Sequence, residues 1–143
     1  MKAKWKNYFM DTAVRTSQLS KDNHTKVGAV ITKDNYILSV GYNGAPKGFL
    51  DESIPKGANE SLLLSKNTYM IHAELNAVLN YRGSLSDLKD SEVFVTVFPC
   101  HNCMLLLAQL GISKVYYLYD YRPEENEASK HIAELAKINI EKL

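Results

Sequence analysis

The second half of the chain alternates strand-like and helix-like segments, and this order limits the possible folds more than any other feature of the sequence. Runs rich in branched and aromatic residues at 91–98 and 114–121 predict strands, and the apolar stretch 103–111 between them predicts a buried helix. A further helix is expected from about Glu124 to Lys137, and the tail 138–143 is a candidate for a last short strand. Strands that alternate with helices pack in layers, so we predict an α/β fold with helices on both faces of one sheet.

The first half adds a helix, a hairpin and a long loop. An amphipathic helix is expected at 5–19, and two β-rich runs, 27–32 and 36–42, flank a compact Lys-Asp-Asn turn that predicts a β-hairpin. Glycines and prolines then interrupt 43–68, and such a long irregular loop within a compact domain is usually functional or mobile. Apolar residues spaced for a helix return at 72–82.

Length and charge bound the class of protein. The chain has 143 residues without repeats or low-complexity linkers, and we expect one domain spanning 1–143. The net charge of +1 argues against a dedicated nucleic-acid binder and favours a small substrate. No apolar run approaches the roughly 20 residues of a membrane span, and the basic N-terminal segment lacks the apolar stretch of a signal peptide. We therefore expect a soluble protein of the reducing cytoplasm.

Both cysteines of the chain lie in one motif, FPCHNC, which runs from Phe98 to Cys103. Two cysteines this close would form too small a loop to stabilise a fold. Three interpretations are left: a redox pair, half of a structural zinc site, or half of a catalytic zinc site. Pro99 occupies a position where helices often begin, so Cys100 is expected at a helix N-terminus, where unpaired N–H groups favour a thiolate. This placement alone suits a redox pair as well as a zinc site.

His72 and Glu74 discriminate among these interpretations. They begin the next helix upstream, whose first turn can direct an imidazole and a carboxylate into one pocket, and a redox pair needs neither. Three ligands, His72, Cys100 and Cys103, would leave the fourth tetrahedral position of zinc open to water, as in catalytic sites. Two thiolates cancel the formal charge of the zinc ion, so the ion should acidify its bound water less than it would in an all-histidine site. A neighbouring base then becomes useful, and Glu74 is placed to be that base. His101 is expected to face away from the cluster. H-x-E followed by P-C-x-x-C is the signature of zinc nucleobase deaminases.

On these motifs the sequence resembles the cytidine deaminase-like superfamily, and more closely its deoxycytidylate (dCMP) deaminases. The segments VGAVI, GYNGAPKG, HAELNAVLN, VFPCHNC and LGISKVYY follow one another in the order typical of the family. The resemblance implies a three-layer α/β/α cytidine deaminase-like fold with a mixed sheet of about five strands. It also implies that His72, Cys100 and Cys103 bind one catalytic Zn²⁺. By the same resemblance Glu74 carries protons between the attacking water, N3 of cytosine and the leaving amine.

The activity implied by the resemblance is zinc-dependent hydrolytic deamination of dCMP to dUMP and ammonia, which would supply dUMP for thymidylate synthesis. A few members of the family also accept dCTP. Polynucleotide deaminases, which act on transfer RNA or single-stranded DNA, share the zinc core, as do free nucleoside deaminases, and a non-enzymatic zinc-stabilised module is a further alternative. The near-neutral charge and the GYNG-P-G loop count against a polynucleotide, and Glu74 beside an open zinc position counts against a structural module.

The residues expected to hold the nucleotide come from three places. By resemblance, Tyr121 and Arg122 help bind the phosphate, and the region before VGAV contributes His24 and Lys26 as a basic, hydrogen-bonding neighbourhood. Asn43 resembles the asparagine that holds the sugar in the superfamily, and its amide can both donate to and accept from a hydroxyl. The alternative for Tyr121 is packing in a core or a subunit contact, and for Asn43 a purely conformational turn.

Regulation and assembly are also implied by the resemblance. Family members are often activated by dCTP and inhibited by dTTP, with an effector site near the GYNG-P-G loop. In this chain the corresponding residues are Tyr42, Asn43, Gly44, Pro46 and Gly48. A bound nucleoside triphosphate would bring Mg²⁺ with it. A homo-oligomer, by resemblance a hexamer, is expected, whereas nucleic-acid and membrane partners are not.

Overall fold

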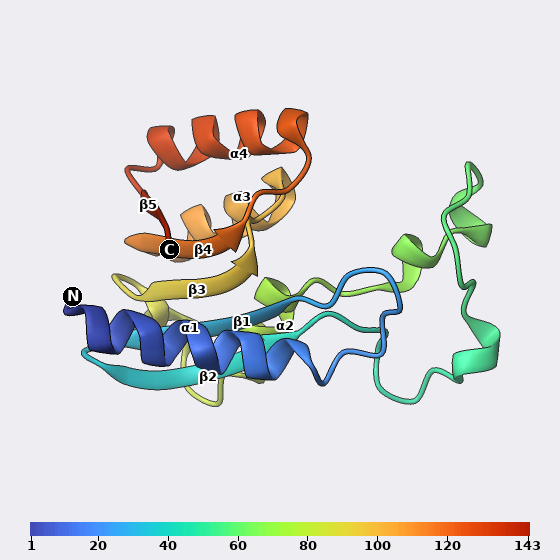
Figure 1. The fold of residues 1–143 in the computed structure, drawn as a ribbon, viewed down its shortest axis with the longest axis horizontal. Helices are drawn as coiled ribbons and strands as arrows, with labels where there is room; N and C mark the ends of the chain where they lie inside the picture. Colours follow the sequence, from blue (N-terminus) through green and yellow to red (C-terminus); the bar gives the residue numbers. More distant parts are fainter.

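The computed structural model describes residues 1–143 and places five strands in one mixed sheet (Figure 1). The strands lie in the order β2-β1-β3-β4-β5. Their bounds are β1 Gly28–Lys33, β2 Tyr36–Tyr42, β3 Glu92–Val97, β4 Lys114–Tyr119 and β5 Asn139–Lys142. Strand β1 pairs antiparallel with both β2 and β3, whereas β3, β4 and β5 are parallel to one another. The predicted mixed sheet of five strands is therefore confirmed.

Helices cover both faces of this sheet, as predicted. The four α-helices are α1 Ala3–Ser17, α2 Ala73–Asn80, α3 His101–Leu110 and α4 Pro123–Leu135. Helix α1 packs on one face over a small buried cluster that includes Phe9 and Phe94, and α2, α3 and α4 pack on the other face over a larger one that includes Val95 and Leu107. The three-layer α/β/α fold is confirmed. None of the helices combines the length and the apolar character needed to cross a bilayer.

The predicted hairpin joins β1 to β2 through a two-residue turn. Asp34 and Asn35 have φ angles of 52° and 63°, in the left-handed region that short polar side chains tolerate. Positive φ at both central residues gives the turn a twist that matches the twist of the flanking strands. The sequence between the two β-rich runs therefore fixes their antiparallel pairing.

Helix α2 lies against the edge strand β2, and this contact places the start of α2. A Cβ atom on Gly41 would overlap the backbone of Ala73 and Ala77, so the close approach requires a glycine. Asn76 and Asn80 donate side-chain N–H groups to the carbonyl oxygens of Tyr42 (2.8 Å) and Val40 (3.0 Å). These bonds satisfy carbonyl groups of the edge strand and hold the helix along it.

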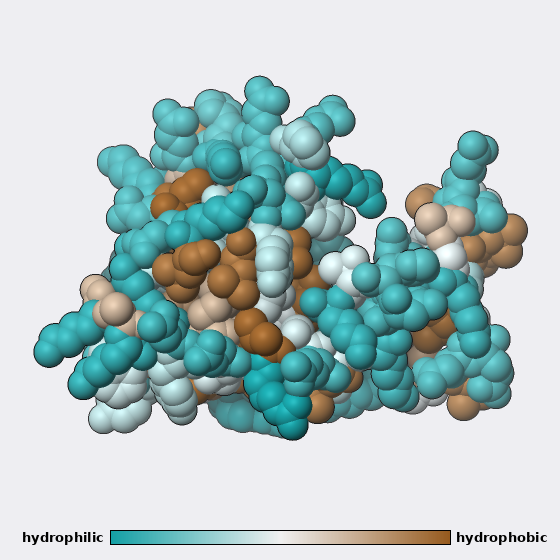
Figure 2. All heavy atoms as spheres, in the orientation of Figure 1, coloured by the Kyte–Doolittle hydropathy of each residue, from teal (hydrophilic) through white to brown (hydrophobic).

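Residues 44–71 form a segment, called the arm below, that protrudes from the layered body (Figure 1). Its base is closed by an isolated bridge in which the N–H groups of Gly44 and Ile71 each donate to the other's carbonyl oxygen, at 3.0 and 2.8 Å. Along it lie only short 3₁₀ turns at Asp51–Ser53, Leu62–Leu64 and Lys66–Tyr69; a fourth, outside the arm, spans Leu85–Leu88. Hydrophobic surface is visible on the arm in Figure 2. The prediction of an irregular 43–68 is confirmed.

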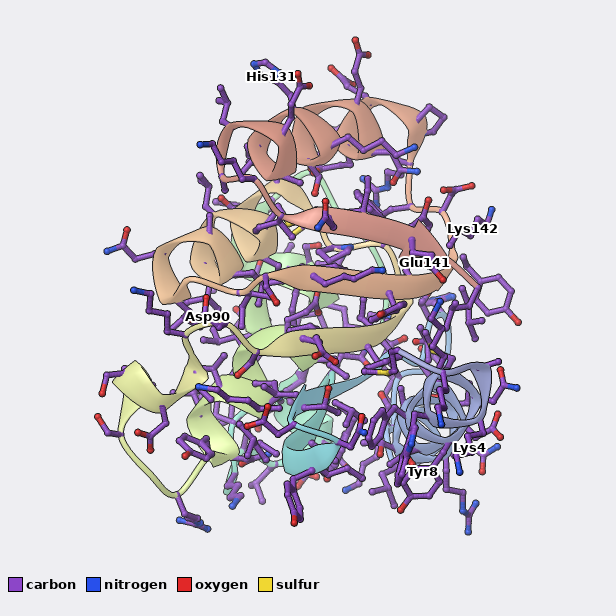
Figure 3. All side chains as sticks on the ribbon, turned by 90° about the vertical axis from the view of Figure 1, so that its left-hand side faces the viewer. Lys4, Tyr8, Asp90, His131, Glu141 and Lys142 are labelled. Carbon is purple, nitrogen blue, oxygen red and sulfur yellow. The ribbon has the colours of Figure 1, made fainter.

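The prediction of a buried helix at 103–111 holds for only part of α3. Met104 and Leu107 are fully buried, whereas Leu105 is 53% exposed. A helix that packs on one face of a sheet keeps an outer side, and an unbroken apolar run hides which side that is. Tyr8 of α1 likewise extends from the outer side of its helix, as Figure 3 shows.

Candidate active site

Three potential metal ligands from two helix N-termini converge at one end of the sheet. His72 and Cys100 are the N-cap residues of α2 and α3, and Cys103 lies in the first turn of α3. The Nδ1 atom of His72 lies 3.5 Å from Sγ of Cys100 and 3.4 Å from Sγ of Cys103, and all three ligand atoms lie within 4.8 Å of one another. Zinc bonds of ~2.0–2.3 Å place tetrahedral ligand atoms roughly 3.5–3.8 Å apart. The cluster therefore fits zinc, with one coordination position left over.

The turn that presents the cysteines is fixed from both sides. Cys100 has an extended backbone, and its sulfur accepts the N–H of Cys103 at 3.5 Å in the manner of a helix cap. The first helical hydrogen bond of α3 follows, from the N–H of Met104 to the carbonyl oxygen of Cys100 at 2.9 Å. On the other side, the Ser129 hydroxyl of α4 donates to the carbonyl oxygen of Pro99 at 2.8 Å. Both sulfur atoms are thus held by backbone geometry and not by side-chain rotamers alone.

His101, between the two cysteines, lies outside the cluster, as predicted. Its Nδ1 atom is 2.8 Å from Oε2 of Glu125, and the same carboxylate oxygen accepts the His101 backbone N–H at 3.0 Å. This hydrogen bond raises the pKa of His101. Glu125 thereby holds the first turn of α3 against α4, a role that no motif in the sequence indicated.

The groups of the cluster change one another's pKa, and Glu74 is suited to proton transfer. A hydrogen bond from the Cys103 thiol lowers the pKa of Cys100 to about 4, whereas the hydrogen bonds to Cys100 raise the pKa of Cys103 and that of His72. Glu74, in the first turn of α2, is only 4% exposed, and this burial raises the pKa of its carboxyl group. A buried carboxyl beside the cluster can keep a proton at a pH where an exposed one would lose it.

The cluster opens into a cavity of about 840 Å³, called the main cavity below. His72, Glu74 and Cys100 line one part of it. The nucleotide-binding residues predicted from the sequence also line it, and these are His24, Lys26, Asn43, Tyr121 and Arg122. The structure therefore brings together side chains that are widely separated in the sequence.

Two cations of the main cavity lack a carboxylate partner within the chain. No ion pair involves Lys26 or Arg122, whereas the cavity carboxylate of Asp120 is paired with Lys142 at 2.8 Å. The guanidinium carbon of Arg122 lies 5.5 Å from the ring centroid of Tyr121, which favours an orientation over the ring. Uncompensated positive charge at a cavity attracts an anionic group.

Asn43 uses its side-chain amide to hold neighbouring backbone. Its Oδ1 atom accepts the N–H of Val27 at 2.8 Å, and its Nδ2 atom donates to the carbonyl oxygen of Thr25 at 2.9 Å. The residue is buried in the wall of the main cavity. The contact with a sugar that the sequence suggests stays a prediction.

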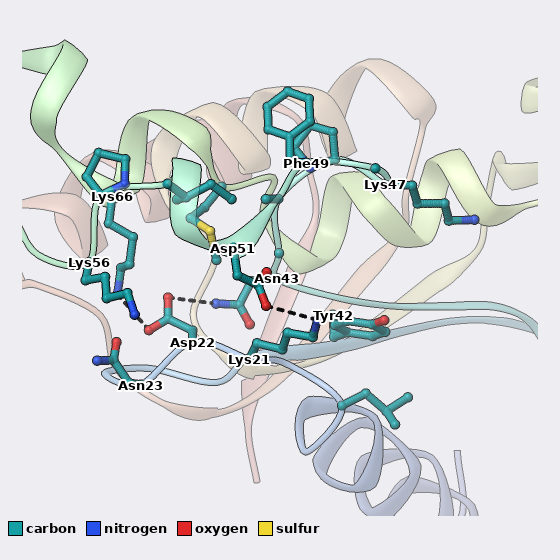
Figure 4. Close-up of a pocket in the computed structure, with 18 residues that line it drawn as sticks. Lys21, Asp22, Asn23, Tyr42, Asn43, Lys47, Phe49, Asp51, Lys56 and Lys66 are labelled. Atoms are coloured by element: carbon teal, nitrogen blue, oxygen red, sulfur yellow. Dashed lines mark hydrogen bonds and ion pairs between the residues drawn. The ribbon is translucent and has the colours of Figure 1, made fainter.

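A second cavity of about 460 Å³ lies at the base of the arm (Figure 4). It is lined by the whole set of residues predicted for an effector site, namely Tyr42, Asn43, Gly44, Pro46 and Gly48. Lysines 21, 47, 56 and 66 also line it. The second cavity and the main cavity share Asp22, Asn43, Lys66 and Met70, so these four residues separate the two.

Sequence reasoning missed Asp22 and Lys66, which form a nearly buried ion pair at 2.7 Å. The sequence does contain a signal for Asp22, because an aspartate side chain commonly accepts the backbone N–H groups of the residues two and three positions after it. The DNHT segment, which begins at Asp22, allows this turn. Lys66 carries no such signal, since its partner lies 44 residues away.

Comparison with known proteins agrees with this geometry. Residues 3–119 match the family model described as the cytidine and deoxycytidylate deaminase zinc-binding region. The deoxycytidylate deaminase of Mus musculus is 37% identical over 142 residues, covering 96% of this chain and 79% of its own length. That of Homo sapiens is 38% identical over 127 residues, covering 87% of this chain and 70% of its own length.

A solved structure extends the likeness to three dimensions. The crystal structure of dCMP deaminase from the cyanophage S-TIM5 in complex with dCMP and dUMP matches 100% of this chain and 99% of that chain. The TM-score is 0.81 at 32% sequence identity. The chain thus belongs to the family of zinc-binding cytidine and deoxycytidylate deaminases.

Proposed function

We propose that the chain is a zinc-dependent hydrolase that converts dCMP to dUMP and ammonia, and so supplies dUMP for thymidylate synthesis. The observation that carries the proposal is the buried Glu74 carboxyl beside a His-Cys-Cys cluster, in a cavity that also holds unpaired cations. The relatives at 37% and 38% identity are deoxycytidylate deaminases, and the similar cyanophage enzyme was crystallised with dCMP and dUMP. A deoxycytidine monophosphate presents the base, sugar and phosphate that such a cavity can hold.

His72, Cys100 and Cys103 would hold the zinc ion, whose chemistry when bound is that of a Lewis acid that makes a water molecule more acidic. Glu74 takes a proton from the water that attacks C4 of cytosine and delivers it to N3. It then delivers the second proton of that water to the amine at C4, which leaves as ammonia. Burial suits Glu74 to both transfers, because its raised pKa lets the carboxyl keep a proton between them.

The phosphate of the substrate would lie against Lys26 and Arg122, with His24 and Tyr121 as further hydrogen-bonding groups. Support comes from the absence of a carboxylate partner for either cation and from their place in the wall of the cavity that contains Glu74. A free nucleoside has no phosphate and would leave the positive charges of Lys26 and Arg122 without a partner, which favours a nucleotide over a nucleoside as the substrate. Asn43 would contact the sugar.

The second cavity is the proposed site for dCTP and dTTP as effectors, with Mg²⁺ on the triphosphate. Lys47 and Lys56, which have no carboxylate partner in the chain, and the loop from Tyr42 to Gly48 support this assignment, because a triphosphate carries several negative charges. The proposal also includes a homo-oligomer, by resemblance a hexamer. Free thiols at Cys100 and Cys103 are consistent with a reducing, cytoplasmic setting.

The test is ammonia release from dCMP, dCTP and deoxycytidine, measured side by side at matched low concentrations with zinc-loaded protein. We expect dCMP to be strongly preferred over deoxycytidine, because the proposed phosphate contacts are available only to the nucleotide. Adding dCTP at fixed dCMP tests the second cavity, and stimulation is expected. Equal or better turnover of deoxycytidine would contradict the phosphate site and indicate a nucleoside deaminase.

A further inference from the structure

Asp22 lies in the wall between the two cavities, and both of its carboxylate oxygens are engaged (Figure 4). Its Oδ1 atom accepts the backbone N–H groups of His24 at 2.8 Å and Thr25 at 3.1 Å, and it also accepts Lys66 Nζ at 2.7 Å. Its Oδ2 atom lies 3.5 Å from Nδ2 of Asn43. The Asp22 side chain is only 7% exposed.

These contacts hold a segment that has no regular secondary structure. Residues 21–27 lie between α1 and β1 outside any helix or strand, and they supply His24 and Lys26 to the main cavity. Without a sheet or helix to define it, the path of this backbone depends on side-chain acceptors and donors. Asp22 binds its start, and Asn43 binds Thr25 and Val27 farther along.

Lys66 brings a second, distant part of the chain into this arrangement. It belongs to the arm, and its side chain is 11% exposed. One other ion pair joins the arm to residues 21–27, between Lys21 and Asp51 at 3.4 Å, but both of its side chains are largely exposed. Ion pairs in solvent contribute little, whereas removing one partner of a buried pair leaves a costly unpaired charge.

The carboxyl group of Asp22 is held in its charged form by these neighbours. Burial raises its pKa, but the hydrogen bonds from Lys66, His24 and Thr25 outweigh burial and leave the pKa below its usual value. The carboxylate is therefore a permanent acceptor for the two backbone N–H groups and for the ammonium group.

We propose that Asp22 is a positioning residue, which sets the backbone of 24–26 against the phosphate of the substrate, with Lys66 of the arm as its counterion. The inference rests on the proposed function at one point, namely that His24 and Lys26 face the phosphate. Asp22 need not touch the substrate, and it acts through the segment that does. Its removal should therefore impair dCMP binding without impairing the chemistry at Glu74.

The experiment compares Asp22→Ala with Asp22→Asn on two substrates, dCMP and deoxycytidine. Asp22→Ala removes the acceptor, and we expect KM for dCMP to rise about tenfold or more while kcat stays within about twofold. Asp22→Asn keeps an oxygen for the two N–H groups and should recover most of the loss. The kcat/KM for deoxycytidine should fall much less than that for dCMP in either variant, because deoxycytidine has no phosphate to be positioned and depends on Asp22 only through Asn43 at the sugar.

Lys66→Met tests the counterion and remains informative if Asp22→Ala does not fold. In the wild-type background it leaves the buried carboxylate unpaired, so KM for dCMP should rise by about threefold or more. In the Asp22→Asn background no charge is left unpaired, and the same substitution should add little. Lys114→Met is the control for the loss of a lysine from a partly buried pair, here with Glu141 at 3.1 Å, at the other end of β4 from the cavity residue Tyr119. Glu141 keeps its second partner, Lys6, at 2.8 Å, so this substitution leaves no carboxylate unpaired.

The outcomes separate this inference from the proposed function. Wild-type protein with equal kcat/KM for dCMP and deoxycytidine would overturn the phosphate site and this inference with it. A wild-type preference for dCMP, combined with an unchanged KM in Asp22→Ala, would overturn the inference alone. So would equal losses on both substrates, failure of Asp22→Asn to rescue, or effects of Lys66→Met that simply add to those of Asp22→Asn.

Discussion

The metal-ligand cluster and the arm sit side by side on the main cavity, yet they are built in opposite ways. The cluster lies on the first turns of α2 and α3, and buried Phe98 and Met104 support it from the core. The arm has only short 3₁₀ turns, and its leucines at 62, 63 and 64 are 77%, 72% and 56% exposed. Few buried apolar contacts mean a low free energy of local opening, so the arm should open far more readily than the cluster.

This difference would suit the two tasks proposed for the cavity, which are catalysis and nucleotide binding. Reacting groups must be held within a fraction of an ångström, which packed helix starts can do. Nucleotide binding tolerates and often uses a segment that moves, and four arm residues line the cavity, namely Ala58, Lys66, Asn67 and Met70. The comparison predicts that disturbances of the cluster and of the arm should have effects of very different size.

Removal of zinc should have the largest effect. A chelator at neutral pH is expected to abolish deamination and to lower Tm by about 5 °C or more, because unpaired thiolate and imidazole groups replace a bound ion. Hydrogen exchange should then accelerate at the starts of α2 and α3, with the arm unchanged. Added zinc should restore all three readouts. Faster hydrogen exchange confined to the arm would contradict the expected difference between the cluster and the arm.

The second largest effect is expected from Glu74→Gln, which should reduce the turnover of dCMP by about a thousandfold or more, since an amide cannot carry the proton. Zinc content and Tm should stay close to those of the wild type, because glutamine has nearly the same shape. Glu127→Gln, on the exposed side of α4, is the matched control and should leave the rate unchanged. A near-normal rate of ammonia release in Glu74→Gln would remove Glu74 from the mechanism.

The same contrast explains how much the sequence could reveal. His72, Glu74, Cys100 and Cys103 lie in two short motifs at helix starts, so the pattern of neighbours predicted both their chemistry and their convergence. The order of strands and helices likewise predicted the layers of the fold. Local sequence contains this information because helix caps and turns are local structures.

The parts that escaped prediction depend on long-range contacts. In the sequence Lys66 and Glu125 look like ordinary charged surface residues. Only the fold shows that Lys66 pairs with Asp22 and that Glu125 pairs with His101. The exposed side of Leu105 was missed because a run of leucines has no visible polar face. For Lys66 and Glu125 the deciding contact lies outside the window over which periodicity and motifs can be read.

Two glycine substitutions compare the body with the arm directly. Gly41→Ala should destabilise the protein by about 3 kcal/mol, because the new methyl group meets the backbone of Ala73 and Ala77 between β2 and α2. Gly57→Ala on the arm has no heavy atom within 4 Å of the new Cβ, so the free energy of unfolding should change by less than about 0.5 kcal/mol. Denaturant unfolding of both variants measures the difference, and a similar loss in the two would contradict it.

The smallest effect is expected from Leu63→Ser at the arm. The side chain is 72% exposed, so its loss should move Tm by less than about 2 °C and leave kcat/KM for dCMP unchanged. Leu107→Ser, at a fully buried position of α3, is the control and should destabilise by about 3 kcal/mol or more. Thermal unfolding at two protein concentrations, with sedimentation to count subunits, checks both variants. A large fall in Tm for Leu63→Ser, accompanied by dissociation, would mean that a second copy covers the arm, and the arm would then be ordered by assembly and not by its own contacts.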